Sequence, residues 1–241
     1  MFKYIAFVLF VSGAFMRPAL AQGNVCRASD RACVIAALLS TAKEIENVSW
    51  RDQSYREIAK SLAADGRFGE AIDVWDQIQN PDTKALTIRG IGMAAADRDL
   101  LQDQYDALFK TLRTKSEMIE HPPSYAIALT YIAMAQAFAD DDAGAWTTAA
   151  SMENDALRHK AYGETAEIQA ERGDVAAAMK SIGYIESVAF RNKAYALVSK
   201  ILADQALFDE ALQAAEPVTN SYKKAKALQY VLDLQGADSE N

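Results

Sequence analysis

The chain has 241 residues, of which 51% are hydrophobic and 24% are charged, an ordinary balance for a globular protein and too apolar for a disordered one. Only 11 Gly and 5 Pro occur, which argues against an all-β sandwich or barrel because such folds need a turn about every 8–12 residues. The formal net charge of −8 disfavours nucleic-acid binding, and two Cys cannot form a zinc cage without His partners, of which the chain has only two.

Residues 1–21 have the features of a Sec-type signal peptide. Lys3 supplies the positive charge, Ile5 to Phe15 form an apolar run too short to span a bilayer, and Ala19-Leu20-Ala21 is an A-x-A cleavage site. We therefore predict a periplasmic or secreted protein, with no membrane insertion after signal cleavage. An uncleaved membrane anchor is the alternative, and the well-formed cleavage site disfavours it.

Cys26 and Cys33 belong to a predicted N-terminal capping segment, residues 22–44. Their spacing is two turns of a continuous helix, about 10.5 Å of rise, whereas a disulfide needs Cα atoms closer than about 7 Å. The pair can bond only if a helix starts between them, and Ser29 and Asp30 are good N-cap residues in that gap. After export to an oxidising compartment, we expect a disulfide in which Cys26 folds back onto the first turn that carries Cys33. A redox or metal-binding pair is the alternative, which the spacing and the lack of nearby His disfavour.

From residue 45 onward the sequence is repetitive. A large apolar residue, here called the anchor, recurs at spacings of 33, 41, 33, 33 and 33, and a turn-forming residue follows two positions later. The anchors are Ile45, Ile78, Ile119, Met152, Ile185 and Val218, and the turn residues are Asn47, Asn80, His121, Asn154, Ser187 and Asn220. Small residues recur 14 and 18 positions after the anchor, the second set being Ala63, Ala96, Ala137, Ala170 and Ala203. Such repeats indicate units that bury their apolar faces by stacking on their neighbours.

Each unit is predicted to be a pair of antiparallel helices, five pairs over residues 45–217. In the first unit the apolar residues have the i, i+3, i+4, i+7, i+8 spacing of an amphipathic helix: Tyr55, Ile58, Ala59, Leu62 and Ala63. Asp65-Gly66 then gives a helix C-cap signal before a shorter second helix. The second unit is eight residues longer, and Leu100 to Met118 fits a lengthened second helix. Residues 218–241 are predicted to hold a capping helix, about Asn220 to Leu234 with its lysines facing solvent, and a fraying tail from Gly236.

This pattern resembles the tetratricopeptide repeat family. The first unit carries the family's alternation of bulky and small residues at Tyr55, Ile58, Ala59, Leu62, Ala71 and Trp75. The period is 33 residues rather than about 34, and three polar residues depart from the core signature: Gln136, Thr165 and Gln169. The resemblance covers residues 45–234 and implies an all-α fold, a right-handed α-α solenoid of about five helical hairpins plus capping helices.

No catalytic motif is recognisable, since G-x-S-x-G, H-E-x-x-H, the P-loop and G-x-G-x-x-G are all missing from the sequence. We expect no catalysis, no cofactor and no metal. His121 and His159 are interpreted as capping or solvated residues of turns. Three consecutive carboxylates, Asp140-Asp141-Asp142, cannot point at one calcium ion and are expected to place negative charge at the start of a helix. An acid/base pair assembled from distant residues is the alternative.

The tetratricopeptide resemblance also implies that the first helix of each unit lines a concave groove. Partner binding is predicted at six of the groove positions: Arg56, Lys60, Arg89, Met93, Met134 and Phe138. The basic residues would clamp an acidic group or a C-terminal carboxylate, and the apolar ones would hold an apolar side chain. Further along, the groove is expected to become acidic through Glu167 and Glu171. The alternative is that the Arg and Lys side chains are solvated and the Met side chains pack between helices.

The sequence thus predicts an exported adaptor that binds a protein or peptide in its groove without catalysis. One alternative is an accessory or structural subunit of a cell-envelope enzyme or assembly, including one that self-assembles through exposed ends; the other is an enzyme of unrecognised type. Light scattering of the purified protein separates the self-assembling structure from the adaptor.

Overall fold

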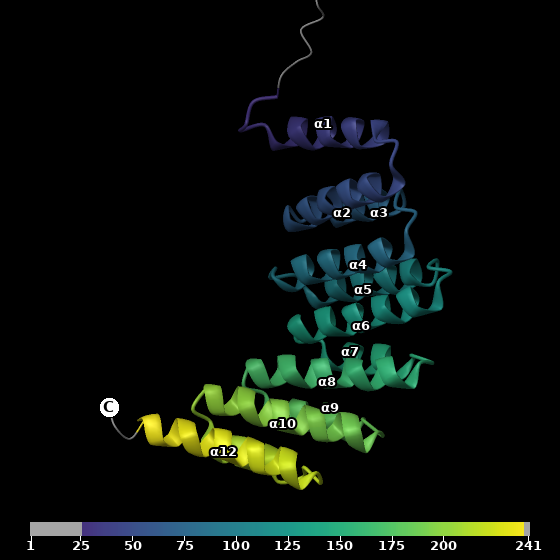
Figure 1. Cartoon of the computed structure of the whole chain (residues 1–241). Helices are drawn as coiled ribbons and strands as arrows, with labels where there is room; N and C mark the ends of the chain where they lie inside the picture. Colours follow the sequence, from purple (N-terminus) through teal and green to yellow (C-terminus); the bar gives the residue numbers. More distant parts are fainter. Residues whose placement is uncertain (1–25, 239–241) are drawn as a thin grey trace, which may run out of the picture. The chain divides into compact units, whose positions relative to one another are not determined.

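A computed structural model describes residues 26–238, so the predicted signal peptide and the last three residues lie outside the described part of the chain. The described residues form twelve α-helices and no strand, which confirms the all-α prediction (Figure 1). None of these helices combines the length and hydrophobicity that a membrane span requires. The described residues divide into two compact units between Ala37 and Leu38, inside the first helix.

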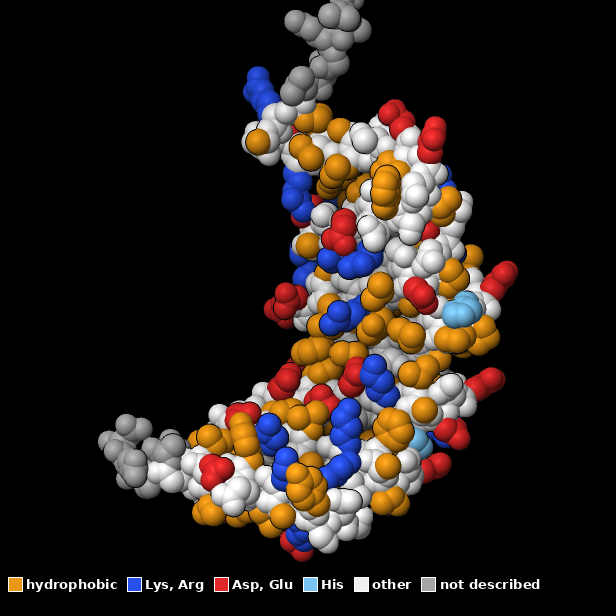
Figure 2. All heavy atoms as spheres, in the orientation of Figure 1, with side chains coloured by type: hydrophobic (Ala, Val, Ile, Leu, Met, Phe, Trp, Pro, Cys, Tyr) orange, Lys and Arg blue, Asp and Glu red, His pale blue; other side chains and the backbone are white. Residues whose placement is uncertain are grey.

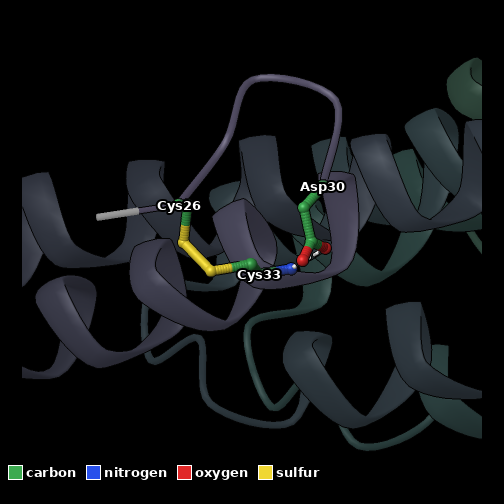
Figure 3. Close-up of a disulfide and its surroundings, with 3 residues drawn as sticks. All are labelled: Cys26, Asp30 and Cys33. Atoms are coloured by element: carbon green, nitrogen blue, oxygen red, sulfur yellow. Dashed lines mark hydrogen bonds between the residues drawn. A yellow bond between two sulfur atoms is a disulfide. The ribbon is translucent and has the colours of Figure 1, made fainter. Parts of the chain in front are cut away.

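The first unit is organised by the disulfide between Cys26 and Cys33 (Figure 3). Helix α1 (Arg31–Glu44) begins between the two cysteines, and their Cα atoms are 5.6 Å apart. The Asp30 carboxylate accepts a hydrogen bond of 2.9 Å from the backbone N–H of Cys33, as an N-cap residue does. The predicted disulfide and the predicted helix start are both confirmed.

The second unit alternates long and short helices. The long ones are α2 (Val48–Ala64), α4 (Pro81–Ala96), α6 (Pro122–Phe138), α8 (Asp155–Glu171), α10 (Val188–Asp204) and α12 (Ser221–Asp238). Between them lie α3 (Phe68–Trp75), α5 (Gln102–Ser116), α7 (Asp142–Ala150), α9 (Val175–Gly183) and α11 (Phe208–Ala215). Helix α5 has 15 residues against 8 or 9 in its counterparts, so the insertion does lengthen the second helix of the second pair.

Each long helix packs against the next long helix, from α2 through α12, and against the short helix that follows it. The long helices therefore form one consecutive row (Figure 1). Each short helix contacts the long helices before and after it. The row, rather than one compact centre, carries the apolar core of the unit.

The repeat positions found in the sequence have equivalent roles in the structure. Five anchors are no more than 4% exposed, namely Ile78, Ile119, Met152, Ile185 and Val218. The residue two positions after the anchor precedes a long helix, and where it is Asn its side chain accepts a hydrogen bond from the backbone N–H three residues on, as an N-cap does. The bonds measure 3.1 Å for Asn47, 2.9 Å for Asn80 and 3.0 Å for Asn154. The same short sequence segment thus ends one helix pair and starts the next.

The polar residues that interrupt the core signature are buried, and the two glutamines are paired. Gln136 accepts a hydrogen bond of 2.7 Å from the Thr148 hydroxyl, and Gln169 accepts one of 2.6 Å from Ser181. The equivalent pairs in the first and fifth units are apolar: Leu62 with Val74, and Leu202 with Ala214. Because polar partners occur together, each buried amide oxygen is satisfied and the helix pair keeps its geometry.

Long side chains tie each helix pair to the one before it. Arg98, one residue after the C-cap of α4, and Arg172, the C-cap of α8, donate from Nη1 to the carbonyl oxygens of Ala64, at 2.9 Å, and Ala137, at 2.8 Å. Gln205 donates in the same way to the last two carbonyls of α8. Carbonyls at a helix C-terminus lack partners within the helix, so the following unit supplies their donors.

Four long helices, α2, α6, α8 and α10, end in the same turn. The residue after the C-cap has a positive φ, and the next N–H bonds to the carbonyl five residues earlier, as in a Schellman motif. The positive-φ residues are Gly66 at 79°, Asp140 at 59°, Gly173 at 82° and Ala206 at 60°. A residue with a Cβ costs about 1–2 kcal/mol in this conformation, so Ala206 stores strain.

One expectation about the C-terminus is wrong. Helix α12 runs to Asp238, past the predicted end at Leu234, and includes Gly236. A single Gly lowers helix stability by about 1 kcal/mol relative to Ala, which is too little to end a helix that packs on its neighbours.

We expect Ala206→Gly to raise the free energy of unfolding by about 1 kcal/mol, because Gly adopts a positive φ without a Cβ contact. Gly173→Ala is the matched reverse change: a Cβ there would meet no atom within 4 Å, so its loss of stability reports backbone strain alone. Urea denaturation followed by circular dichroism measures both variants. A less stable Ala206→Gly variant would contradict the assignment.

Thiol titration checks the disulfide, whose Cα atoms lie within bonding range. The unfolded protein, isolated from an oxidising compartment, should show no free thiol before reduction and two per chain afterwards. A Cys33→Ser variant, as control, should show one thiol. Two free thiols before reduction would rule the bond out.

Candidate partner-binding face

Helices α4, α6 and α8 together line an open groove of about 430 Å³, here called the central groove. Its lining residues are Arg89, Tyr131, Met134, Phe138, Lys160, Glu164, Glu167, Ile168 and Glu171. They come from three successive units of the repeat, so the groove exists only where the long helices lie side by side.

Three of the six predicted partner-binding residues, Arg89, Met134 and Phe138, meet in the central groove. The Arg89 guanidinium lies 5.4 Å from the ring centroid of Tyr131, a cation–π contact that holds it beside the apolar residues. Phe138 is 41% exposed, so its ring offers apolar surface to a ligand. One wall of the groove is therefore apolar with a single guanidinium at its edge.

The opposite wall, on α8, is acidic. Burial raises the pKa of Glu167, and the charges of Glu164 and Glu171 raise it further, against the opposing effect of Lys193 and Lys160. The Lys160 ammonium lies 3.4 Å from Glu164. This wall disfavours additional negative charge and favours a cation or a hydrogen-bond donor.

The remaining predicted residues lie outside the central groove. Arg56 and Lys60 both pair with Glu57, with N–O distances of 3.4 Å and 2.9 Å, so this carboxylate occupies two members of the predicted basic clamp. Lys60 also packs on α4, because a Cβ at Gly90 would lie 2.6 Å from the Lys60 Cγ. Met93 is half-buried on α4 and does not line the groove.

A second groove of about 570 Å³, here called the basic groove, lies between α10 and α12. It is lined by Lys193, Ala196, Leu197, Lys200, Lys223, Lys226, Ala227, Gln229, Tyr230 and Asp233. Lys and Arg side chains gather over α8, α10 and α12 in Figure 2. Positions 8, 11, 12 and 15 after the anchor contribute to both grooves, so both lie on the same face of the long helices.

The basic groove was not predicted from the sequence, where the lysines of the last helix were expected only to face solvent. Lys223 and Lys226 are exposed as expected, and they also line the groove. A signal was present eight positions after the anchor, where three consecutive units carry lysine: Lys160, Lys193 and Lys226.

The prediction that His159 lies in a turn is wrong. It lies in the second turn of α8, is 6% exposed, and its ring centroid is 5.7 Å from that of Phe190. Asp52 and Asn192 occupy the same repeat position, and their side chains accept hydrogen bonds from backbone N–H groups of the next turn, such as Thr219 N–H at 2.8 Å. His159 therefore belongs to a structural position of the repeat.

His121 and the aspartate run behave as expected. His121 holds the N-cap position of α6, with its Nδ1 2.7 Å from the Ser124 hydroxyl. Asp141 caps α7, and Asp140 and Asp142 pair with Arg172. Among residues 26–238, no three or more His, Cys, Asp or Glu side chains are grouped to hold a metal ion.

Comparison of the chain with protein-family models, with curated proteins and with solved structures found no match.

Glu167→Gln should raise the thermal unfolding midpoint near pH 7.5. The folded state raises the pKa of this carboxyl, so it binds the proton more tightly than the unfolded state, and ionisation above that pKa lowers stability. The gain should shrink as pH falls into the carboxyl range near pH 4.5, where protonation is favourable to the native protein. Calorimetry of Glu167→Gln against the exposed control Glu153→Gln measures it. A gain that grows at low pH, or an equal gain in the control, would contradict this reading.

Proposed function

We propose that this protein is an exported helical-repeat adaptor, periplasmic or secreted, that binds a protein or peptide partner along the exposed face of its long helices and performs no catalysis. The observation that carries the proposal is the position of the two grooves. Four repeat positions contribute to both, and both combine apolar and charged side chains. Repeat proteins of stacked helix pairs bind partners along the surface that their repeats build together.

The architecture in this proposal is a right-handed α-α solenoid similar to the tetratricopeptide repeats. Its support is the 33-residue spacing of anchors and N-caps, and the packing of each long helix on the next. In such a solenoid the long helices line the concave surface, where an extended or helical peptide contacts several units at once.

Export is the third part of the proposal. The predicted A-x-A site at Ala19-Leu20-Ala21 supports it, and so does the Cys26–Cys33 disulfide, because such bonds persist mainly in oxidising compartments.

Site-specific photo-crosslinking in intact cells of the source organism tests the binding face. A benzoyl-phenylalanine at Phe138, which is exposed in the central groove, should give discrete adducts with a partner protein. The same probe at Asp73, exposed on the short helix α3, is the matched control and should give none. Adducts from Asp73 alone would show that the partner binds a different face. The absence of adducts from both positions would overturn the adaptor function.

A further inference from the structure

We infer that the basic groove between α10 and α12 binds an acidic peptide segment that carries a large apolar side chain. This inference rests on the proposed function and names the chemistry of the partner.

The floor of the basic groove is apolar. Ala227 is 4% exposed, while Ala196, Leu197 and the ring of Tyr230 are half-buried along the groove. Its volume of about 570 Å³ lies within the range of ligand pockets, about 300–1,000 Å³. An apolar side chain that enters this groove exchanges water contact for contact with both helices.

Four ammonium groups surround this floor: Lys193 and Lys200 from α10, and Lys223 and Lys226 from α12. None of them forms an ion pair with a carboxylate of the described residues, whereas Lys60, Lys115, Lys160 and Lys224 do. The one carboxylate in the lining, Asp233, accepts a hydrogen bond of 2.7 Å from Gln229. In a chain with a net charge of −8, this concentration of unpaired positive charge favours an acidic ligand.

Part of the positive charge is held in place before any ligand arrives. The Lys200 ammonium lies 4.3 Å from the ring centroid of Tyr230, and the Tyr230 hydroxyl donates a hydrogen bond to Asp204 on α10. Lys226 lies 5.2 Å from the ring centroid of Tyr222. A groove whose charged groups are already positioned loses less side-chain freedom on binding.

The surroundings of the groove favour a short acidic segment over a long anionic surface. The neighbouring wall on α8 carries Glu164, Glu167 and Glu171, and Lys193 is close enough to influence the pKa of Glu167. A nucleic acid or an anionic bilayer large enough to cover both helices would also face these carboxylates, which repel it. A peptide confined to α10 and α12 avoids them.

The test uses the chain without residues 1–21 and a defined probe, the fluorescein-labelled peptide Glu-Leu-Glu-Glu-Phe-Glu. Fluorescence anisotropy should show saturable binding that weakens at least about tenfold between 50 and 300 mM NaCl, since exposed charges are screened by salt. A peptide with Lys in place of each Glu should not bind, and one with Ala in place of Leu and Phe should bind more weakly.

Two double variants with the same net charge separate the groove from general electrostatics. Lys193→Glu with Lys226→Glu should weaken binding of the acidic peptide by at least about tenfold. Lys43→Glu with Lys110→Glu changes two exposed lysines outside the basic groove and should leave the affinity unchanged. Circular dichroism of both variants verifies that they are folded.

Three results would overturn the inference: no saturable binding of the acidic peptide, equal binding by the two double variants, or binding to phosphatidylglycerol vesicles in its place. A dimer in light scattering that only Lys193→Glu with Lys226→Glu dissociates would also overturn it, in favour of a second copy of the chain. Crosslinking at Phe138 does not depend on these lysines. If the acidic peptide does not bind but Phe138 forms crosslinks, the adaptor function stands and the inference about the basic groove fails. If the peptide binds but Phe138 forms no crosslink, the adaptor function fails and peptide binding by the groove remains.

Discussion

Close contact between successive long helices is the interaction on which the rest of the second unit depends. It is possible because small residues recur 14 positions after the anchor, where Ala59, Ala133 and Ala166 are fully buried. At the same position of α4, a Cβ added to Gly92 would lie 2.8 Å from the Cβ of Ala135 on α6. Both grooves form at seams between adjacent long helices, so their shape follows directly from this spacing.

Side-chain hydrogen bonds at the helix ends add to the helix packing that the small residues allow. At the C-terminal ends of the long helices, Arg98, Arg172 and Gln205 donate to the last carbonyls of the preceding long helix. Near the N-terminal ends of α8 and α10, Arg158 and Arg191 donate to the carbonyls of the anchors six residues earlier, at 2.9 Å and 3.0 Å. These donors stand at fixed repeat positions, so equivalent helix ends are satisfied in successive units wherever the donor is present.

The sequence was sufficient for features that are local and periodic. The anchors, the N-caps, the lengthened α5 and the disulfide all follow from spacing along the chain. The grooves depend on distances between helices and on side-chain conformations, which spacing does not fix. The sequence pattern gave no sign that Glu57 pairs with Arg56 and Lys60, two members of the predicted clamp. The position of His159, by contrast, could have been predicted, because it shares its repeat position with Asp52 and Asn192.

The positive-φ endings and side-chain donors at the C-terminal ends of the long helices are unevenly distributed along the row. Helix α4 is the exception among the long helices of the five pairs: it lacks the positive-φ ending, and Ala139, at the repeat position of Arg98 and Arg172, has no side-chain donor to reach its carbonyls. Cooperativity in a stack of repeats depends on the coupling between neighbours. At the C-terminal end of α4 that coupling comes from packing, and the packing of α4 on α6 is the most extensive of any two helices in the described part of the chain, so it holds these two pairs together without a donated hydrogen bond.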